Sequence, residues 1–167
     1  SIVFFEDKGL QRSQQIFTDL NKNAVRTSNS IAELYDSRDE LAVVTRKVVM
    51  SIEFLDTYTD KEKDNLGKNS SKIFTLTNIY KANKNILHAS IQDGDKEFLV
   101  DFWTNVVNNI IEWQELLGKK LSKADLKRSY ILCLNITLLA LGRIGNYYYL
   151  HKEIDMSSQL TALRKID

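Results

Sequence analysis

The chain contains no proline, and only 6 of its 167 residues are glycine. Proline and glycine are the residues least compatible with a helix interior, so their scarcity favours long helices. The single cysteine, Cys133, excludes an internal disulfide and a cysteine-based zinc cluster. The formal net charge is only +1, so any affinity for a nucleic acid must come from a local basic patch.

Long apolar runs are also missing, because no stretch of the sequence reaches the roughly 18 apolar residues that a membrane-spanning helix needs. Hydrophobic residues make up 43% and charged residues 27% of the chain, which is the composition of an ordinary globular protein. The length suits one sizeable core. We therefore expect a cytoplasmic, mainly α-helical single domain spanning residues 1–167, with no membrane association and one short N-terminal strand and turn within residues 1–9.

Hydrophobic periodicity and capping residues predict a series of helices. The expected ranges are 10–24, 31–36, 40–56, 75–91 and 96–117, followed by a last long helix after Ser122. Asp39, Thr75 and Ser122 are suitable N-caps for three of these helices. The segment from Ile131 to Leu141 is apolar nearly all round, which predicts the most buried helix. We expect Cys133, within that segment, to be a buried and unreactive thiol.

Two groups of residues are candidates for contact with DNA. Binding to DNA needs lysines and arginines that meet phosphates, and asparagine, glutamine or arginine side chains that reach base edges. The polar face of the expected helix 10–24 and the basic stretch 68–84 offer such residues. The candidates are Arg12, Gln15, Lys22, Asn23, Arg26, Lys72, Lys81 and Lys84. Spacing alone also fits a solvated outer face without a function.

No catalytic or metal-binding constellation is evident in the sequence. His88 and His151 lie far apart and outside any known motif, so we expect neither a cofactor nor a metal, and no enzyme within this chain. The segment Tyr35-Asp36-Ser37-Arg38-Asp39 is rich in charge, and aspartate–arginine pairs form strong bidentate bonds. Arg38 either locks a loop against Asp36 or Asp19 or belongs to a binding site, and the sequence leaves both open.

Several short motifs in the first half of the chain occur together in one known family. They include Gln15, Phe17, Asp19, Leu20, Asn21, Ala24, Val25, Ser30, Tyr35, Asp36, Arg38, Asp39, Lys72, Phe74, Thr75, Leu76 and Tyr80. With these residues the chain resembles the second half of the DndB family of DNA sulfur modification (phosphorothioation) proteins, in the DGQHR-domain group. The Asp-Gly-Gln-His-Arg signature itself is absent. The chain therefore resembles the C-terminal portion of a longer α/β protein, with residues 1–9 belonging to the upstream domain.

The resemblance implies a DNA-binding regulatory protein, a transcriptional repressor of its own operon, that works beside other sulfur-modification proteins. It implies no sulfur chemistry in this chain. Two alternatives remain. The DGQHR group is similar to ParB and sulfiredoxin-like proteins, so residues 11–39 could complete a nucleotide-binding or catalytic site built mainly upstream. The chain could also be a protein-interaction module, with the helix that carries Trp103 and Trp113 as its partner surface.

Overall fold

The computed structural model describes residues 38–67, 70–87 and 90–166. The strand expected in residues 1–9 and the helices expected at 10–24 and 31–36 lie outside the described residues. The described part is mainly α-helical, which confirms the predicted fold class. Its α-helices are α3 (Glu40–Ser51), α4 (Glu53–Tyr58), α5 (Leu76–Leu87), α6 (Asp95–Asn109), α7 (Ile111–Leu117), α8 (Lys123–Ser129), α9 (Asn135–Leu150) and α10 (Met156–Gln159). Two 3₁₀ helices, η1 (Ile131–Cys133) and η2 (Leu160–Lys165), lie before α9 and after α10.

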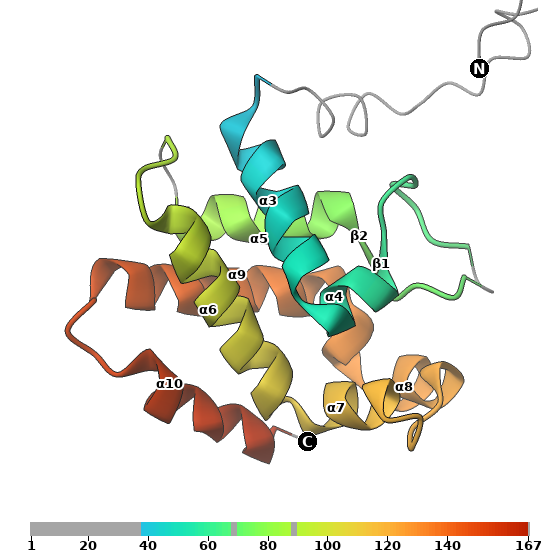
Figure 1. Cartoon of the computed structure of the whole chain (residues 1–167). Coiled ribbons are helices and arrows are strands. Elements are labelled where there is room, and N and C mark those ends of the chain that lie inside the picture. Colours follow the sequence, from blue (N-terminus) through green and yellow to red (C-terminus); the bar gives the residue numbers. More distant parts are fainter. Residues whose placement is uncertain (1–37, 68–69, 88–89, 167) are drawn as a thin grey trace, which may run out of the picture.

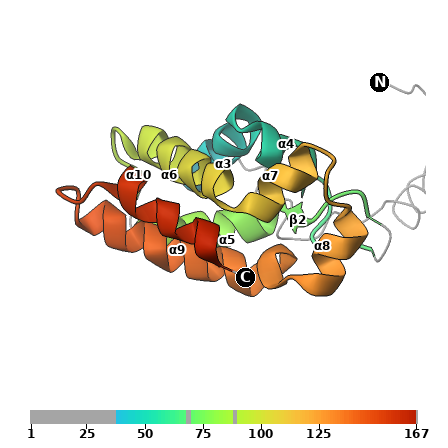
Figure 2. The ribbon, with the colours of Figure 1, turned by 90° about the horizontal axis from the view of Figure 1, so that it is seen from below.

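The helices form two layers. Helices α5 and α9 lie side by side in one layer, and α3 and α6 cross them in the other (Figures 1 and 2). Gly142 of α9 faces the backbone of Ala82, and Gly145 faces Ile86, so α5 and α9 run in the same direction. The amide of Asn146 donates to the carbonyl oxygen of Ile86 at 2.6 Å and ties the pair together. The α5–α9 pair therefore forms the layer against which α3 and α6 pack.

The three predicted caps are present. The carboxylate of Asp39 accepts a hydrogen bond from the Ala42 amide at 2.9 Å and starts α3. The Ser122 hydroxyl accepts from the Asp125 amide at 3.1 Å and starts α8. The Thr75 hydroxyl accepts from the Asn78 amide at 3.3 Å in the first turn of α5. Each cap satisfies an amide that a helix end would otherwise leave unpaired.

Two predicted helices are broken by single isoleucines. Ile52 has extended dihedral angles (φ −118°, ψ 111°) and separates α3 from α4, where one helix was expected over 40–56. Ile110 (φ −86°, ψ 106°) separates α6 from α7 within the range 96–117. Both side chains are buried. Each bend points an isoleucine into the core, so both flanking helices bury their apolar sides. A continuous apolar stripe in the sequence does not show such a bend.

A short parallel strand pair was not predicted. Strand β1 (Thr59–Asp60) pairs with β2 (Phe74–Thr75), with Thr59 opposite Phe74 and Asp60 opposite Thr75. Two residues per strand are too few for an alternating pattern to be visible in the sequence. The pair fixes the end of α4 next to the start of α5.

The core contains a group of fully buried aromatic side chains: Trp103, Trp113, Phe54, Phe74 and Phe102. Trp103 also belongs to a buried polar group that joins three helices. Its indole N–H donates to the Asn83 side-chain oxygen at 2.7 Å, and the Asn83 amide donates to the Thr45 hydroxyl at 3.0 Å. Both tryptophans are therefore core residues that the chain itself covers, and the alternative of a protein-interaction module stays a prediction.

The segment expected to be the most buried helix is neither one helix nor the centre of the core. The region after Ser122 divides into α8, η1 and α9. Leu138 is fully buried, but Ile131 is 62% exposed and Ile136 is 64% exposed. The buried face of α9 lies against α5, whereas Ile136 and other residues of its opposite face are exposed to solvent. The segment is apolar nearly all round because α9 has an exposed apolar face, and not because the helix lies at the centre of the core.

Cys133 also differs from its prediction. It lies in the 3₁₀ turn η1 and is half-buried rather than part of the core. Burial nevertheless raises the pKa of its thiol from 9.0 to about 11, although the nearby charge of Lys127 acts in the opposite direction. The expected low reactivity therefore follows from partial desolvation of the thiol.

Candidate functional site

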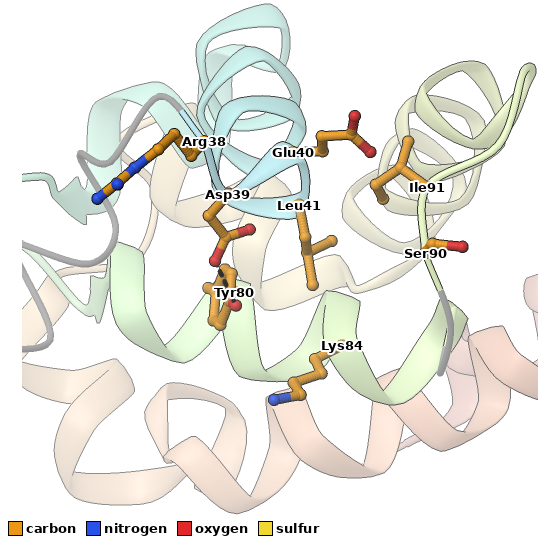
Figure 3. Close-up of a pocket in the computed structure, with 8 residues that line it drawn as sticks. All are labelled: Arg38, Asp39, Glu40, Leu41, Tyr80, Lys84, Ser90 and Ile91. Atoms are coloured by element: carbon orange, nitrogen blue, oxygen red, sulfur yellow. Dashed lines mark hydrogen bonds between the residues drawn. The ribbon is translucent and has the colours of Figure 1, made fainter.

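An open cavity lies where the start of α3 meets α5. Its volume is about 340 Å³. The cavity is lined by residues from the beginning of α3, from α5 and from the segment that follows α5 (Figure 3). These residues are Arg38, Asp39, Glu40, Leu41, Tyr80, Lys84, Ser90 and Ile91. Four of them, Arg38, Asp39, Tyr80 and Lys84, were singled out from the sequence.

Asp39 holds one wall of this cavity together. One carboxylate oxygen caps α3 through the Ala42 amide. The other accepts a hydrogen bond from the Tyr80 hydroxyl at 2.8 Å, which is the dashed line in Figure 3. Both oxygens of Asp39 therefore have partners, and the residue connects the first turn of α3 with the middle of α5. A residue with this set of bonds positions the wall rather than acting on a ligand.

Two exposed basic side chains lie on α5, and one of them, Lys84, lines the cavity. Lys81 and Lys84 are three residues apart, so they share one face of the helix, and both are exposed. Neither forms an ion pair with an acid among the described residues. Figure 3 shows Lys84 on α5 below the N-terminus of α3, where Arg38 and Glu40 extend to opposite sides. The site thus has Lys84 at its lower edge, and Arg38 with the carboxylates of Asp39 and Glu40 above it.

Lys72 is placed differently from the two α5 lysines. It is half-buried, and its ammonium group donates a hydrogen bond to the carbonyl oxygen of Thr57 at 2.6 Å. This bond joins the segment before β2 to the end of α4. Lys72 therefore already has a structural contact, whereas Lys81 and Lys84 extend into solvent.

Most of the other sequence candidates lie outside the described residues. This applies to the DNA-contact candidates Arg12, Gln15, Lys22, Asn23 and Arg26, and to the motif residues Asp19, Asn21, Tyr35 and Asp36. The proposed pairing of Arg38 with Asp36 or Asp19 therefore stays a prediction. Arg38 itself does take part in an interaction.

Sequence reasoning did not identify Tyr80, Ser90 and Ile91 as cavity residues. For Tyr80 a signal was available, since the family pattern contains this tyrosine and a half-buried tyrosine usually finds a partner for its hydroxyl. The partner, Asp39, lies 41 residues away in the chain. Hydrophobic periodicity reports only on residues that are close in sequence, so this pair becomes evident only in the folded structure.

Metal binding has no candidate group within residues 38–67, 70–87 and 90–166, where no three histidine, cysteine, aspartate or glutamate side chains gather. His151 lies 3.2 Å from the carboxylate of Glu153, and both side chains are exposed. A backbone hydrogen bond, and then His151, lower the pKa of Glu153. Within the same ranges, every helix is too short or too polar to cross a membrane.

Taken together, the fold and this site define a helical domain with an open polar cavity and a lysine-bearing helix face beside it. The chain belongs to the DndB family, described as DNA-sulfur modification-associated, whose family model matches residues 1–167. The match confirms the resemblance found in the sequence. Searches of curated proteins and of solved structures found no match to the chain.

Proposed function

We propose that this chain is a cytoplasmic, DNA-contacting regulatory component of DNA sulfur modification that represses its own operon. The observation that carries the proposal is the pair of exposed lysines on α5, Lys81 and Lys84. They lie on one helix face and form no ion pair with a described acid, and Lys84 lines the cavity built on Asp39 and Tyr80. Membership of a family associated with DNA sulfur modification makes DNA the natural polyanion.

Physical chemistry supports a role for such a pair. Two ammonium groups on adjacent turns of a helix can neutralise neighbouring phosphates, and each phosphate contact releases a condensed counterion. The chain has a net charge of only +1, so its long-range field contributes little and local lysines have a large influence. The candidates Arg12, Gln15, Lys22, Asn23 and Arg26 would extend the contact to further phosphates and to base edges. Other sulfur-modification proteins are proposed partners in the same system.

The test is a DNA titration of the full chain at several salt concentrations. The variant Lys81→Ala/Lys84→Ala should weaken binding to all DNA sequences alike. It should also flatten the slope of log affinity against log salt by about 0.9 for each phosphate that the variant no longer neutralises. The matched control is Lys119→Ala/Lys120→Ala, which removes the same charge from two exposed lysines after α7. If both double variants bind like the original chain, the α5 lysines are solvated surface.

The regulatory part of the proposal needs its own measurement. Binding to the DNA ahead of the chain's own operon is compared with binding to unrelated DNA of equal length. A repressor must favour its operator, and each good base contact contributes about 1–3 kcal/mol of discrimination. Asn23→Ala should reduce this preference with little change in the salt slope. Equal affinity for both DNAs would rule out repression by this chain, and no binding at low salt would rule out DNA contact altogether.

A further inference from the structure

The outer face of α9 is apolar from Ile136 to Leu150, apart from one arginine. Its exposed residues are Ile136, Ala140, Arg143, Ile144, Tyr147 and Leu150. They recur at the three- and four-residue intervals that form the contact seam between two packed helices. Ile136 and Leu150, near the two ends of the helix, are 64% and 67% exposed. Arg143 is the only charged residue in the 16 residues of α9.

A groove widens this face at the N-terminal half of α9. It has a volume of about 220 Å³ and lies between α9, η1 and the C-terminal segment. Figure 2 shows α9 and the C-terminal segment along one edge of the molecule. The groove is lined by apolar side chains and Thr137, and Ile131 and Ile166 at its rim are 62% and 44% exposed. The same surface therefore continues from α9 onto both flanking segments.

The size of this surface is that of a small interface. Its large exposed side chains are Ile131, Ile136, Ile144, Tyr147, Leu150 and Ile166. If a whole large side chain offers about 150–200 Å², their exposed fractions amount to roughly 500 Å². Apolar patches of that size on a soluble chain usually mark a contact surface. A stable interface buries about 800 Å² on each partner, so the expected complex is small and weak.

We propose that this face binds a second copy of the chain, with the two α9 helices antiparallel about a twofold axis at Ala140. One pair of large apolar residues on the face is placed symmetrically about that residue. Ile136 lies four residues before Ala140 and Ile144 four residues after it. The axis places each Ile136 against Ile144 of the second copy, and the small Ala140 side chains let the helices approach at the crossing. Such self-complementarity is what a twofold interface requires.

The position of Arg143 supports the antiparallel arrangement. In that arrangement the two Arg143 residues are offset by the length of six helical residues, about 9 Å along the helix axis. A parallel arrangement would place them side by side and bring two like charges together. The net charge of +1 on each chain adds little repulsion between copies.

The proposal is tested by the molecular mass of the full chain in solution, measured by sedimentation between about 1 and 200 µM, the range expected for a weak interface. The mass should rise towards that of a dimer with concentration. Ile136→Glu should shift the midpoint at least tenfold upward, and so should Ile144→Lys. The double variant carrying both changes should recover dimerisation, because the introduced carboxylate of each copy then faces the introduced ammonium group of the other. Asn108→Glu, at an exposed position on α6, is the matched control and should change nothing.

A cysteine placed on the axis reports the register directly. In a Cys133→Ser background, Ala140→Cys should be linked into a covalent dimer by a short bismaleimide, whereas Asp101→Cys on α6 should not. A monomer throughout the concentration range overturns the proposal, and then residues 1–37 or another protein are left as the cover of the face. A dimer that tolerates Ile136→Glu, or that links equally through position 101, places the interface elsewhere and also overturns it. None of these readouts involves DNA, so the result is independent of the proposed function.

Discussion

Helices α5 and α9 pack against each other through one buried interface, but their outer faces differ in composition. Where they touch, both are apolar and closely packed, with Gly142 against the backbone of Ala82. On its other side α5 carries Lys81 and Lys84, which are exposed to solvent. The other side of α9 carries Ile136 and further apolar residues, with Arg143 as its only charge. The outer face of α5 has the composition of a solvent-exposed surface, and the outer face of α9 has the composition of an interface.

This contrast shows how far hydrophobic patterning describes a helix. In α5 the lysines mark the outer face, so the pattern fixes which side is buried. In α9 both sides are apolar, and the pattern is the same for a helix in the centre of a core and for a helix at an interface. The two cases differ in how many elements of the same chain pack around the helix. For α9 the described residues cover only the side that faces α5 and the core.

The largest effect should come from comparing the two sides of α9. Leu138 points into the core and is 0% exposed to solvent, so Leu138→Ala should lower the free energy of unfolding by about 2–5 kcal/mol. Ile136→Ala, two residues away on the 64% exposed side, should lower it by less than about 0.5 kcal/mol. Urea unfolding at low micromolar concentration measures both.

Measuring at low concentration keeps the chains apart, so that binding between copies does not add to the stability. Equal losses for Leu138→Ala and Ile136→Ala would mean that both sides of α9 are covered in the isolated chain. The distinction between its inner and outer face would then be wrong.

A smaller effect should distinguish two glycines on the inner side of α9. A Cβ atom at Gly142 would lie 2.8 Å from the carbonyl oxygen of Ala82, which belongs to the backbone of α5 and cannot turn away. Gly142→Ala should therefore force the helices apart and destabilise the chain by about 1–3 kcal/mol. A Cβ atom at Gly145 would meet side-chain atoms of Ile86 and Phe102 at 2.9 and 3.0 Å, and side chains can rearrange.

Both substitutions gain about 1 kcal/mol of helix propensity, so this gain does not distinguish them. Gly145→Ala should destabilise the chain less than Gly142→Ala, because its new methyl group meets side chains and not backbone. Thermal unfolding of the two variants measures the order. A stabilising Gly142→Ala would show that α5 and α9 have room to spare at their closest approach, and the shared interface described above would be looser than the distances indicate.

Much of the fold could be predicted because its signals are local. Asp39 and Ser122 cap helices through amides a few residues ahead, and the apolar stripe of α5 repeats every turn. The breaks at Ile52 and Ile110 were missed, because a bend that keeps an isoleucine buried leaves the stripe unchanged. The contact between Asp39 and Tyr80 was missed because it depends on how α3 crosses α5. The family was found from short motifs, yet motifs do not say which side of α9 is covered.

Cys133 lies at the boundary between the buried and exposed sides of this region, and its reactivity should report that position without any change in stability. Only the thiolate reacts with a maleimide or a disulfide reagent. Burial raises the pKa of this thiol from 9.0 to about 11, so at pH 8 the thiolate is about 100-fold scarcer than in the unfolded chain. Labelling of the folded chain should be slower by about that factor and should rise about tenfold for each pH unit up to pH 11. The unfolded chain in urea is the control, and its rate should level off two pH units earlier. Equal rates at pH 8 would show that the thiol is fully solvated and that η1 does not pack against the end of the core.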